Sequence, residues 1–188
     1  MQVQQKKLEY GDSLNKDKKK MGWKVYELMS KLFVEGKDNE YIFAHAFLTL
    51  KWNLMVRSEN VVHAHILHVS WHADCLVFCF IKSKGDQMGW NHDQEWHVYA
   101  NPHHPKICPV LALACYIFSN PGITNRHNLR ESDEVGSDEV GHEGNSAGCL
   151  FPGGNQYNQF MDCLCQIIEK YPQQLIALGI SPVNLGYN

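Results

Sequence analysis

The segment Leu50-Lys-Trp-Asn-Leu-Met-Val-Arg-Ser-Glu-Asn60 joins a helical sequence pattern to a strand-like one. Trp52 and Met55 in this segment and Leu48, one turn earlier, recur at the spacing of one helix face. The pattern stops at residues 58–60, which predicts that Arg57 lies near the helix end, in a bend before the strands. Arg57 is the only arginine before Arg126, and its planar guanidinium can bind two phosphate or carboxylate oxygens at once.

Two helices are predicted up to this segment. Residues 22–34 place apolar side chains at helical spacing, and Gly36 ends the pattern. Asn39 has the chemistry of an N-cap for a second helix, which continues through Leu50 into the arginine segment.

After Asn60 the periodicity changes. Residues 61–64 can finish a helical turn, and three β-prone runs follow, at residues 66–71, 75–82 and 95–100. Residues 72–74 are predicted as a turn and residues 83–89 as a long hairpin tip. We therefore expect an α+β fold, mainly helical with a small three-stranded antiparallel sheet.

The C-terminal part contains three more predicted helices. A buried one runs from Pro109 to Phe118, a second presents one apolar face, and a short one at residues 175–178 is capped by Gly179. The apolar face of the second consists of Phe160, Leu164, Ile167 and Ile168. Residues 120–148 carry the tandem pentapeptide Ser-Asp-Glu-Val-Gly and are predicted to be a disordered acidic insertion.

Length and composition limit the class of protein. With 188 residues, 44% of them hydrophobic, the chain can bury one main core, so we expect a flexible basic tail at residues 1–20 and one domain at residues 21–188. The sequence has no run of about eighteen apolar residues, so we expect no membrane span. The polar N-terminus does not resemble a secretory signal. Seven cysteines in apolar surroundings predict reduced, buried thiols and an intracellular protein.

Charge is unevenly distributed along the chain. The formal net charge is −3, yet residues 1–37 carry nine lysines against five acids. Residues 131–143 carry six acids and no lysine or arginine, so without this segment the net charge would be +3. The sequence therefore predicts a mildly basic body, and Lys18, Lys19, Lys20 and Lys24 are candidates for contact with phosphates, although such lysine-rich tails are usually inert.

Histidine and cysteine crowd one part of the chain, at His63, His65, His68, His72, Cys75 and Cys79. If Cys75 and Cys79 lie on one strand, they are about 13 Å apart, too far for two zinc–sulfur bonds of about 2.3 Å each. We therefore expect no zinc site here. The pair His103-His104 lies between two prolines and is predicted to be an exposed, rigid loop.

A third group consists of Arg57 and Lys84, at the predicted hairpin tip. An arginine clamp and a lysine that gives a proton to a leaving oxygen could act on one phosphate. Two ordinary explanations remain open, because a helix C-terminus attracts an arginine and hairpin tips often carry lysines.

Five sequence words in order resemble the integrase-like tyrosine recombinases of eukaryotic mobile elements. They are Leu50-x-Trp-Asn-Leu-Met-x-Arg-Ser-x-Asn60, Ser83-Lys-x-Asp-Gln-x-Gly89, Tyr99-Ala-Asn-Pro102, Cys108-Pro-Val-Leu-Ala-Leu113 and Leu150-Phe-Pro-Gly153. The resemblance covers about residues 22–186. It implies a mainly helical catalytic domain with a small sheet, in which a tyrosine attacks a DNA phosphodiester without metal or nucleotide cofactor. By this resemblance Arg57 would clamp the phosphate and Lys84, or alternatively Lys82, would protonate the leaving 5′-oxygen.

The chain departs from this family at its C-terminal end. Members continue into a His-x-x-Arg motif and a later nucleophilic tyrosine, whereas the one His-x-x-Arg here, at residues 127–130, precedes Leu150, and Tyr187 falls too early. We therefore expect a partial catalytic domain, inactive in strand cleavage by itself, with residual DNA binding and a nuclear location if it acts on DNA. Apolar faces left open by the missing part would favour self-association.

Two other classes remain. The first is a non-enzymatic interaction protein that uses the acidic insertion to bind a basic partner, and the second, more distant, is a zinc-dependent binding module. Neither class requires a membrane.

Overall fold

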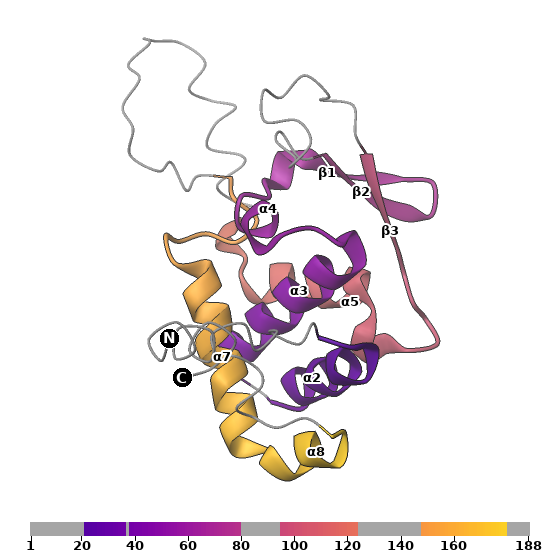
Figure 1. Cartoon of the computed structure of the whole chain (residues 1–188). Coiled ribbons are helices and arrows are strands. Elements are labelled where there is room, and N and C mark those ends of the chain that lie inside the picture. The colour runs from indigo at the N-terminus through magenta and orange to yellow at the C-terminus, as the bar shows by residue number, and fades with distance from the viewer. Residues whose placement is uncertain (1–20, 37, 80–94, 124–147, 180–188) are drawn as a thin grey trace, which may run out of the picture.

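The structure is a computed structural model that describes residues 21–36, 38–79, 95–123 and 148–179. Helices surround one central helix, and a small sheet lies at one end of them (Figure 1). With η marking a 3-10 helix, the elements are α2 (Trp23–Glu35), α3 (Asn39–Leu54), α4 (Ser58–Val62), η1 (Ile66–His68), β1 (Val69–His72), β2 (Cys75–Cys79), β3 (Glu95–Tyr99), η2 (Pro105–Ile107), α5 (Pro109–Ser119), α7 (Gln156–Lys170) and α8 (Pro172–Ala177). The predicted α+β class, mainly helical with three antiparallel strands, is confirmed.

The central helix is α3. Ten of its sixteen residues are buried, because it is apolar on nearly every side and contacts α2, α5 and α7. The predicted N-cap is wrong by one residue, since Asp38 takes that position and Asn39 is the first helical residue.

The core around α3 is rich in aromatic rings. Phe47 lies 4.9 Å from Phe160 of α7 and 5.6 Å from Phe151, measured between ring centroids. Tyr116 of α5 lies 4.9 Å from Phe151, so one ring cluster joins three segments that are distant in sequence. The predicted apolar face of α7 is confirmed, because Phe160, Leu164, Ile167 and Ile168 are all buried.

The end of α3 differs from the prediction. The helix stops at Leu54 because Met55 adopts a left-handed conformation with φ 52°. Residues 58–60, predicted to interrupt the helical pattern, instead begin the new short helix α4. Arg57 therefore lies in a bend before the strands, as predicted, but it precedes a helix and does not end one.

The sheet is an antiparallel meander of order β1-β2-β3. Val69 pairs with Phe78 and Phe78 with Trp96, which fixes the register of all three strands. The first strand was predicted too early, since residues 66–68 form η1. The reason is long-range pairing: Ile66 N donates to the carbonyl oxygen of Gly148 (2.8 Å), away from the sheet.

The remaining helices follow the predictions with two corrections. Pro109 does start α5, and Gly179 does follow α8 with φ 71°. However, α8 begins earlier than predicted, at Pro172, and α5 is not buried at its end, because the Phe118 side chain is 85% exposed.

All seven cysteines are free thiols. Cys75, Cys108 and Cys163 are buried as predicted. The prediction is wrong for the other four, because Cys115 is exposed and Cys79, Cys149 and Cys165 are half-buried. Within the described ranges, no helix is long and apolar enough to cross a lipid bilayer.

Candidate functional site

Arg57 occupies the N-cap position of α4 and is exposed. Its carbonyl oxygen accepts hydrogen bonds from Asn60 N (3.0 Å) and Val61 N (3.4 Å), so the backbone at this residue is fixed. The next turn is anchored by Val61, which is 1% exposed and belongs to the main core. The exposed Arg57 side chain is therefore carried by a backbone that hydrogen bonds and core packing hold in place.

Arg57 lies between two helix ends. It follows the C-cap of α3, Met55, by two residues, where the α3 dipole is negative and favours an arginine, and it is also the N-cap of α4, where the dipole is positive. Among the residues that the structure describes, it forms no ion pair. No carboxylate within the described ranges therefore neutralises this guanidinium.

The lysine of the predicted catalytic pair, Lys84 or alternatively Lys82, lies outside the described residues. β2 ends at Cys79, and Lys82 and Lys84 follow in residues 80–94. In Figure 1 the end of β2 and the start of β3 lie toward the same end of the molecule as α4.

The sequence word Leu150-Phe-Pro-Gly153 folds against the segment that follows Arg57. Leu150 N donates to the carbonyl oxygen of Ala64 (2.7 Å), and His65 and Cys149 form an antiparallel bridge. Leu150 and Phe151 are both 0% exposed. Gly148, at φ 86°, leaves room for the His65 ring, because a Cβ atom would overlap with its Nε2. The word at residues 150–153 thus packs against residues 64–66, just beyond the word that contains Arg57, and this contact was not predicted.

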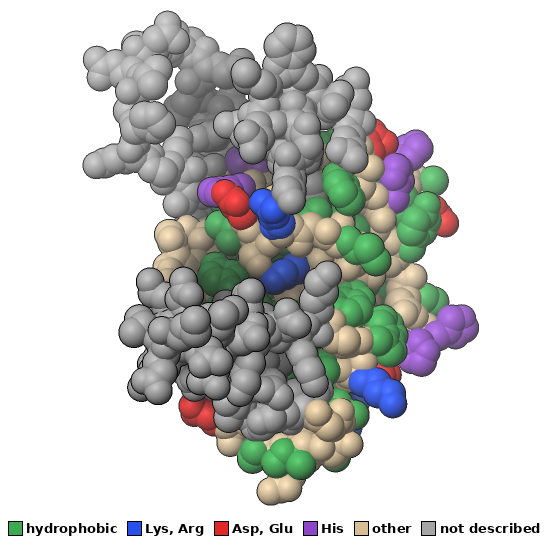
Figure 2. Space-filling view, in the orientation of Figure 1, with side chains coloured by type: hydrophobic (Ala, Val, Ile, Leu, Met, Phe, Trp, Pro, Cys, Tyr) green, Lys and Arg blue, Asp and Glu red, His purple; other side chains and the backbone are tan. Residues whose placement is uncertain are grey.

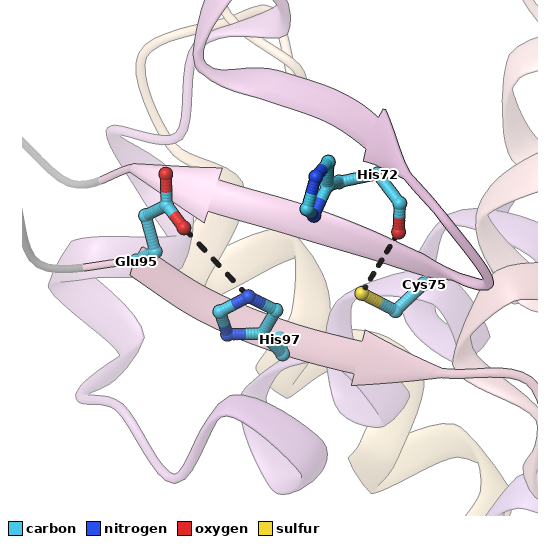
Figure 3. Close-up of polar contacts among 4 residues, drawn as sticks. All are labelled: His72, Cys75, Glu95 and His97. Atoms are coloured by element: carbon cyan, nitrogen blue, oxygen red, sulfur yellow. Dashed lines mark hydrogen bonds and ion pairs between the residues drawn. The ribbon is translucent and has the colours of Figure 1, made fainter.

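The crowded histidines and cysteines do not converge. No three His, Cys, Asp or Glu side chains within the described ranges come close enough together to hold a metal ion. Figure 3 shows four such residues of the sheet: Cys75 Sγ donates to the carbonyl oxygen of His72 (3.3 Å), and His97 lies 3.7 Å from the Glu95 carboxylate. These are two separate local contacts.

The predicted lysine contacts are only partly described. Lys18, Lys19 and Lys20 lie outside the described residues, whereas Lys24 is exposed on α2. The described ranges carry more acids than bases. The bases are Lys24, Lys31, Lys51, Arg57, Lys106 and Lys170, and the acids are Glu27, Glu35, Asp38, Glu40, Glu59, Asp74, Glu95, Asp162 and Glu169. The described ranges are therefore mildly acidic, and the lysines and arginines that give the predicted basic surplus belong to residues outside them.

A groove between α2, η2 and α8 was also not predicted. It has a volume of about 690 Å³ and is lined by Lys24 and Lys31 on one side and by His103, His104 and Lys106 on the other. His103 and His104 are exposed, as predicted. The helical spacing of Lys24, Leu28 and Lys31 was the one sequence signal for it, but nothing in the sequence indicated the opposite wall.

No family model matches this chain, and neither the curated proteins nor the solved structures contain a match. The fold and the site define a mainly helical α+β chain with a fixed, exposed arginine between its central helix and its sheet.

Proposed function

We propose that this chain is part of a DNA breaking-and-rejoining domain of the tyrosine recombinase type, and that Arg57 binds a DNA backbone phosphate. One observation carries the proposal. Arg57 is exposed on a fixed backbone directly after the central helix and before a three-stranded antiparallel sheet. This is the position that the sequence resemblance assigns to the phosphate-clamping arginine.

The chemistry follows from the guanidinium. Its two parallel N–H groups can donate to two phosphate oxygens, and its charge persists at every physiological pH. In the proposed enzyme Lys84, or else Lys82, protonates the leaving 5′-oxygen while a tyrosine attacks phosphorus. The 188 residues contain no His-x-x-Arg after Leu150. The activity we propose for these residues is therefore phosphate binding, within DNA recombination and integration.

The test is the affinity of the 188-residue chain for a duplex oligonucleotide between about 50 and about 200 mM salt. Loss of one phosphate contact lowers the slope of log affinity against log salt by about 1, so we expect this decrease for Arg57→Ala. Arg57→Lys should keep the slope but weaken binding, because an ammonium cannot form the bidentate contact. The same measurement on Lys84→Ala tests the second residue.

Lys170→Ala is the matched control, because Lys170 is exposed at the far end of α7, on the opposite side of the molecule from α4 (Figure 1). Its affinity and salt slope should equal those of the unchanged chain. Equal affinity and equal slope for Arg57→Ala would exclude Arg57 as a phosphate ligand. Undetectable DNA binding by the unchanged chain would overturn the proposal as a whole.

A deletion of residues 131–143 separates this proposal from that of a non-enzymatic interaction protein. The segment carries six acids, so its removal should leave DNA affinity equal or higher. In an interaction protein that uses the acidic segment, the deletion would instead abolish binding of the basic partner. Arg57→Ala would leave the affinity for that partner unchanged.

A further inference from the structure

The groove between α2, η2 and α8 combines an apolar floor with a basic rim. Leu28, Ile107 and Leu178 supply apolar surface, and Lys24, Lys31 and Lys106 supply positive charge. In Figure 2 histidine and basic side chains lie close together at the lower right edge of the molecule. Such a surface can bind an apolar group and a negative charge at the same time.

One wall of the groove is a single face of α2. Lys24, Leu28 and Lys31 are separated by four and three residues, which places them on one face of a helix, and Glu27 lies beside them. The opposite face of α2 carries Met29 and Phe33, both buried in the main core. Lys24 and Lys31 are exposed, so these two groove side chains can be changed without removing core contacts.

The other wall is held in place by buried hydrogen bonds. Tyr26 Oη donates to the carbonyl oxygen of Ile107 (3.2 Å), and burial raises the pKa of Tyr26 to about 12, so the hydroxyl remains a donor. His45 Nε2 lies 2.7 Å from the carbonyl oxygen of Lys106. Two core side chains thus fix η2 against α2 and α3 before any ligand binds, which reduces the entropy lost on binding.

The charge of the groove contrasts with that of its surroundings. Three of the basic side chains of the described ranges gather here, beside one acid, although these ranges carry more acids than bases. Lys106 already pairs with Glu35 (3.2 Å). Lys24 and Lys31 form no ion pair with a described residue, so they are the side chains best placed to meet an added carboxylate.

We propose that this groove binds an acidic peptide segment of a partner protein, with one bulky apolar side chain on the floor and carboxylates against Lys24 and Lys31. Nucleic acid fits less well. No Phe, Tyr or Trp lines the groove, and Glu27 on its α2 wall would repel a phosphate backbone that has no apolar side chain for the floor. The inference does not rest on the function proposed for Arg57.

The experiment measures fluorescence anisotropy of a dye-labelled synthetic peptide of alternating glutamate and leucine, mixed with the 188-residue chain. We expect saturable binding that weakens up to about fivefold with Lys31→Gln, and about 25-fold with Lys24→Glu and Lys31→Glu together. Leu178→Ser, which removes apolar floor at an exposed position, should weaken binding about fivefold. Peptides with lysine for glutamate, or with serine for leucine, should not bind.

Arg57→Ala is the control, since Arg57 lies beside α4 and not among the groove residues. It should leave peptide affinity unchanged and alter only DNA binding, so failure of the two proposals can be told apart. No peptide binding, or equal binding by the double Lys24 and Lys31 variant with an unchanged melting temperature, would overturn the inference. The inference would also be overturned if the groove variants weakened binding of duplex or single-stranded oligonucleotide but not of the peptide. A third contrary result would be that the chain binds no peptide and the groove variants abolish its self-association.

Discussion

α3 and β1 are both rich in apolar and aromatic residues, yet α3 is largely buried and β1 is largely exposed. α3 has neighbours on several sides, and Phe47, near its middle, is 0% exposed. β1 is an edge strand with β2 as its one neighbour in the sheet, and its Trp71 side chain is 58% exposed. The difference shows that burial in this chain is decided by the number of neighbouring elements, so stability should be concentrated around α3.

The largest expected effect comes from removing a ring of the core. Phe47→Ala should lower the free energy of unfolding by about 3–5 kcal/mol, because it leaves a cavity among Phe43, Phe151 and Phe160. Trp71→Ala should cost less than about 1 kcal/mol despite the larger side chain. Urea unfolding of both variants measures the contrast, and equal losses would show that the sheet carries as much stability as the helices.

The next effect concerns the junction between helices and sheet, where Gly148 lies against His65. Gly148→Ala should cost about 2–3 kcal/mol, because it combines a positive φ with an overlap of the new Cβ and the imidazole ring. Gly122→Ala is the matched control, since no atom lies within 4 Å of its added Cβ. Thermal melting of both variants gives the comparison, and an unchanged melting temperature for Gly148→Ala would contradict the described packing.

A smaller effect concerns His45, a buried titratable side chain of α3. Burial lowers the pKa of His45 from its usual 6.5, so below that pH the unfolded chain takes up a proton that the folded chain resists. The contribution of His45 to stability is therefore full above about pH 6.5 and lost as the pH falls. His68 acts in the same direction, because partial burial and nearby His65 lower its pKa.

His45→Gln can keep a donor to Lys106 but does not titrate. We expect it to cost about 1 kcal/mol at neutral pH and to make stability depend less on pH between about 8 and about 5. Chemical denaturation at several pH values checks this, with His68→Gln as the comparison. An unchanged pH dependence in His45→Gln would show that His45 does not titrate differently on folding.

The smallest effect on stability is expected at Arg57, between α3 and the sheet. Its exposed side chain has no ion-pair partner among the described residues, so Arg57→Ala should change the free energy of unfolding by less than about 0.5 kcal/mol. The same variant should clearly weaken DNA binding. A loss of several kcal/mol would instead indicate a structural role.

Features with a regular periodicity were predictable from sequence. The apolar face of α7, the Pro109 start of α5 and the three-stranded meander all follow from local patterns. The bend that carries Arg57 was predictable too, but not its cause, because Met55 is not a residue type that signals a left-handed turn.

Features that depend on distant segments were not predictable. η1 replaces the start of a strand because Gly148 and Leu150 pair with residues 64–66, more than about eighty residues away. The groove likewise needs η2 to be fixed against α2 by Tyr26 and His45. Local sequence patterns contain neither contact.

The position of α3 along the chain has a consequence for synthesis. Its last residue is Leu54, whereas its partner α7 ends at Lys170. At about 5–20 residues per second, the ribosome completes α7 roughly 6–23 s after α3. Throughout that interval the apolar surface that α7 will cover has no α7 to cover it, so the nascent chain offers chaperones a target that the finished chain does not.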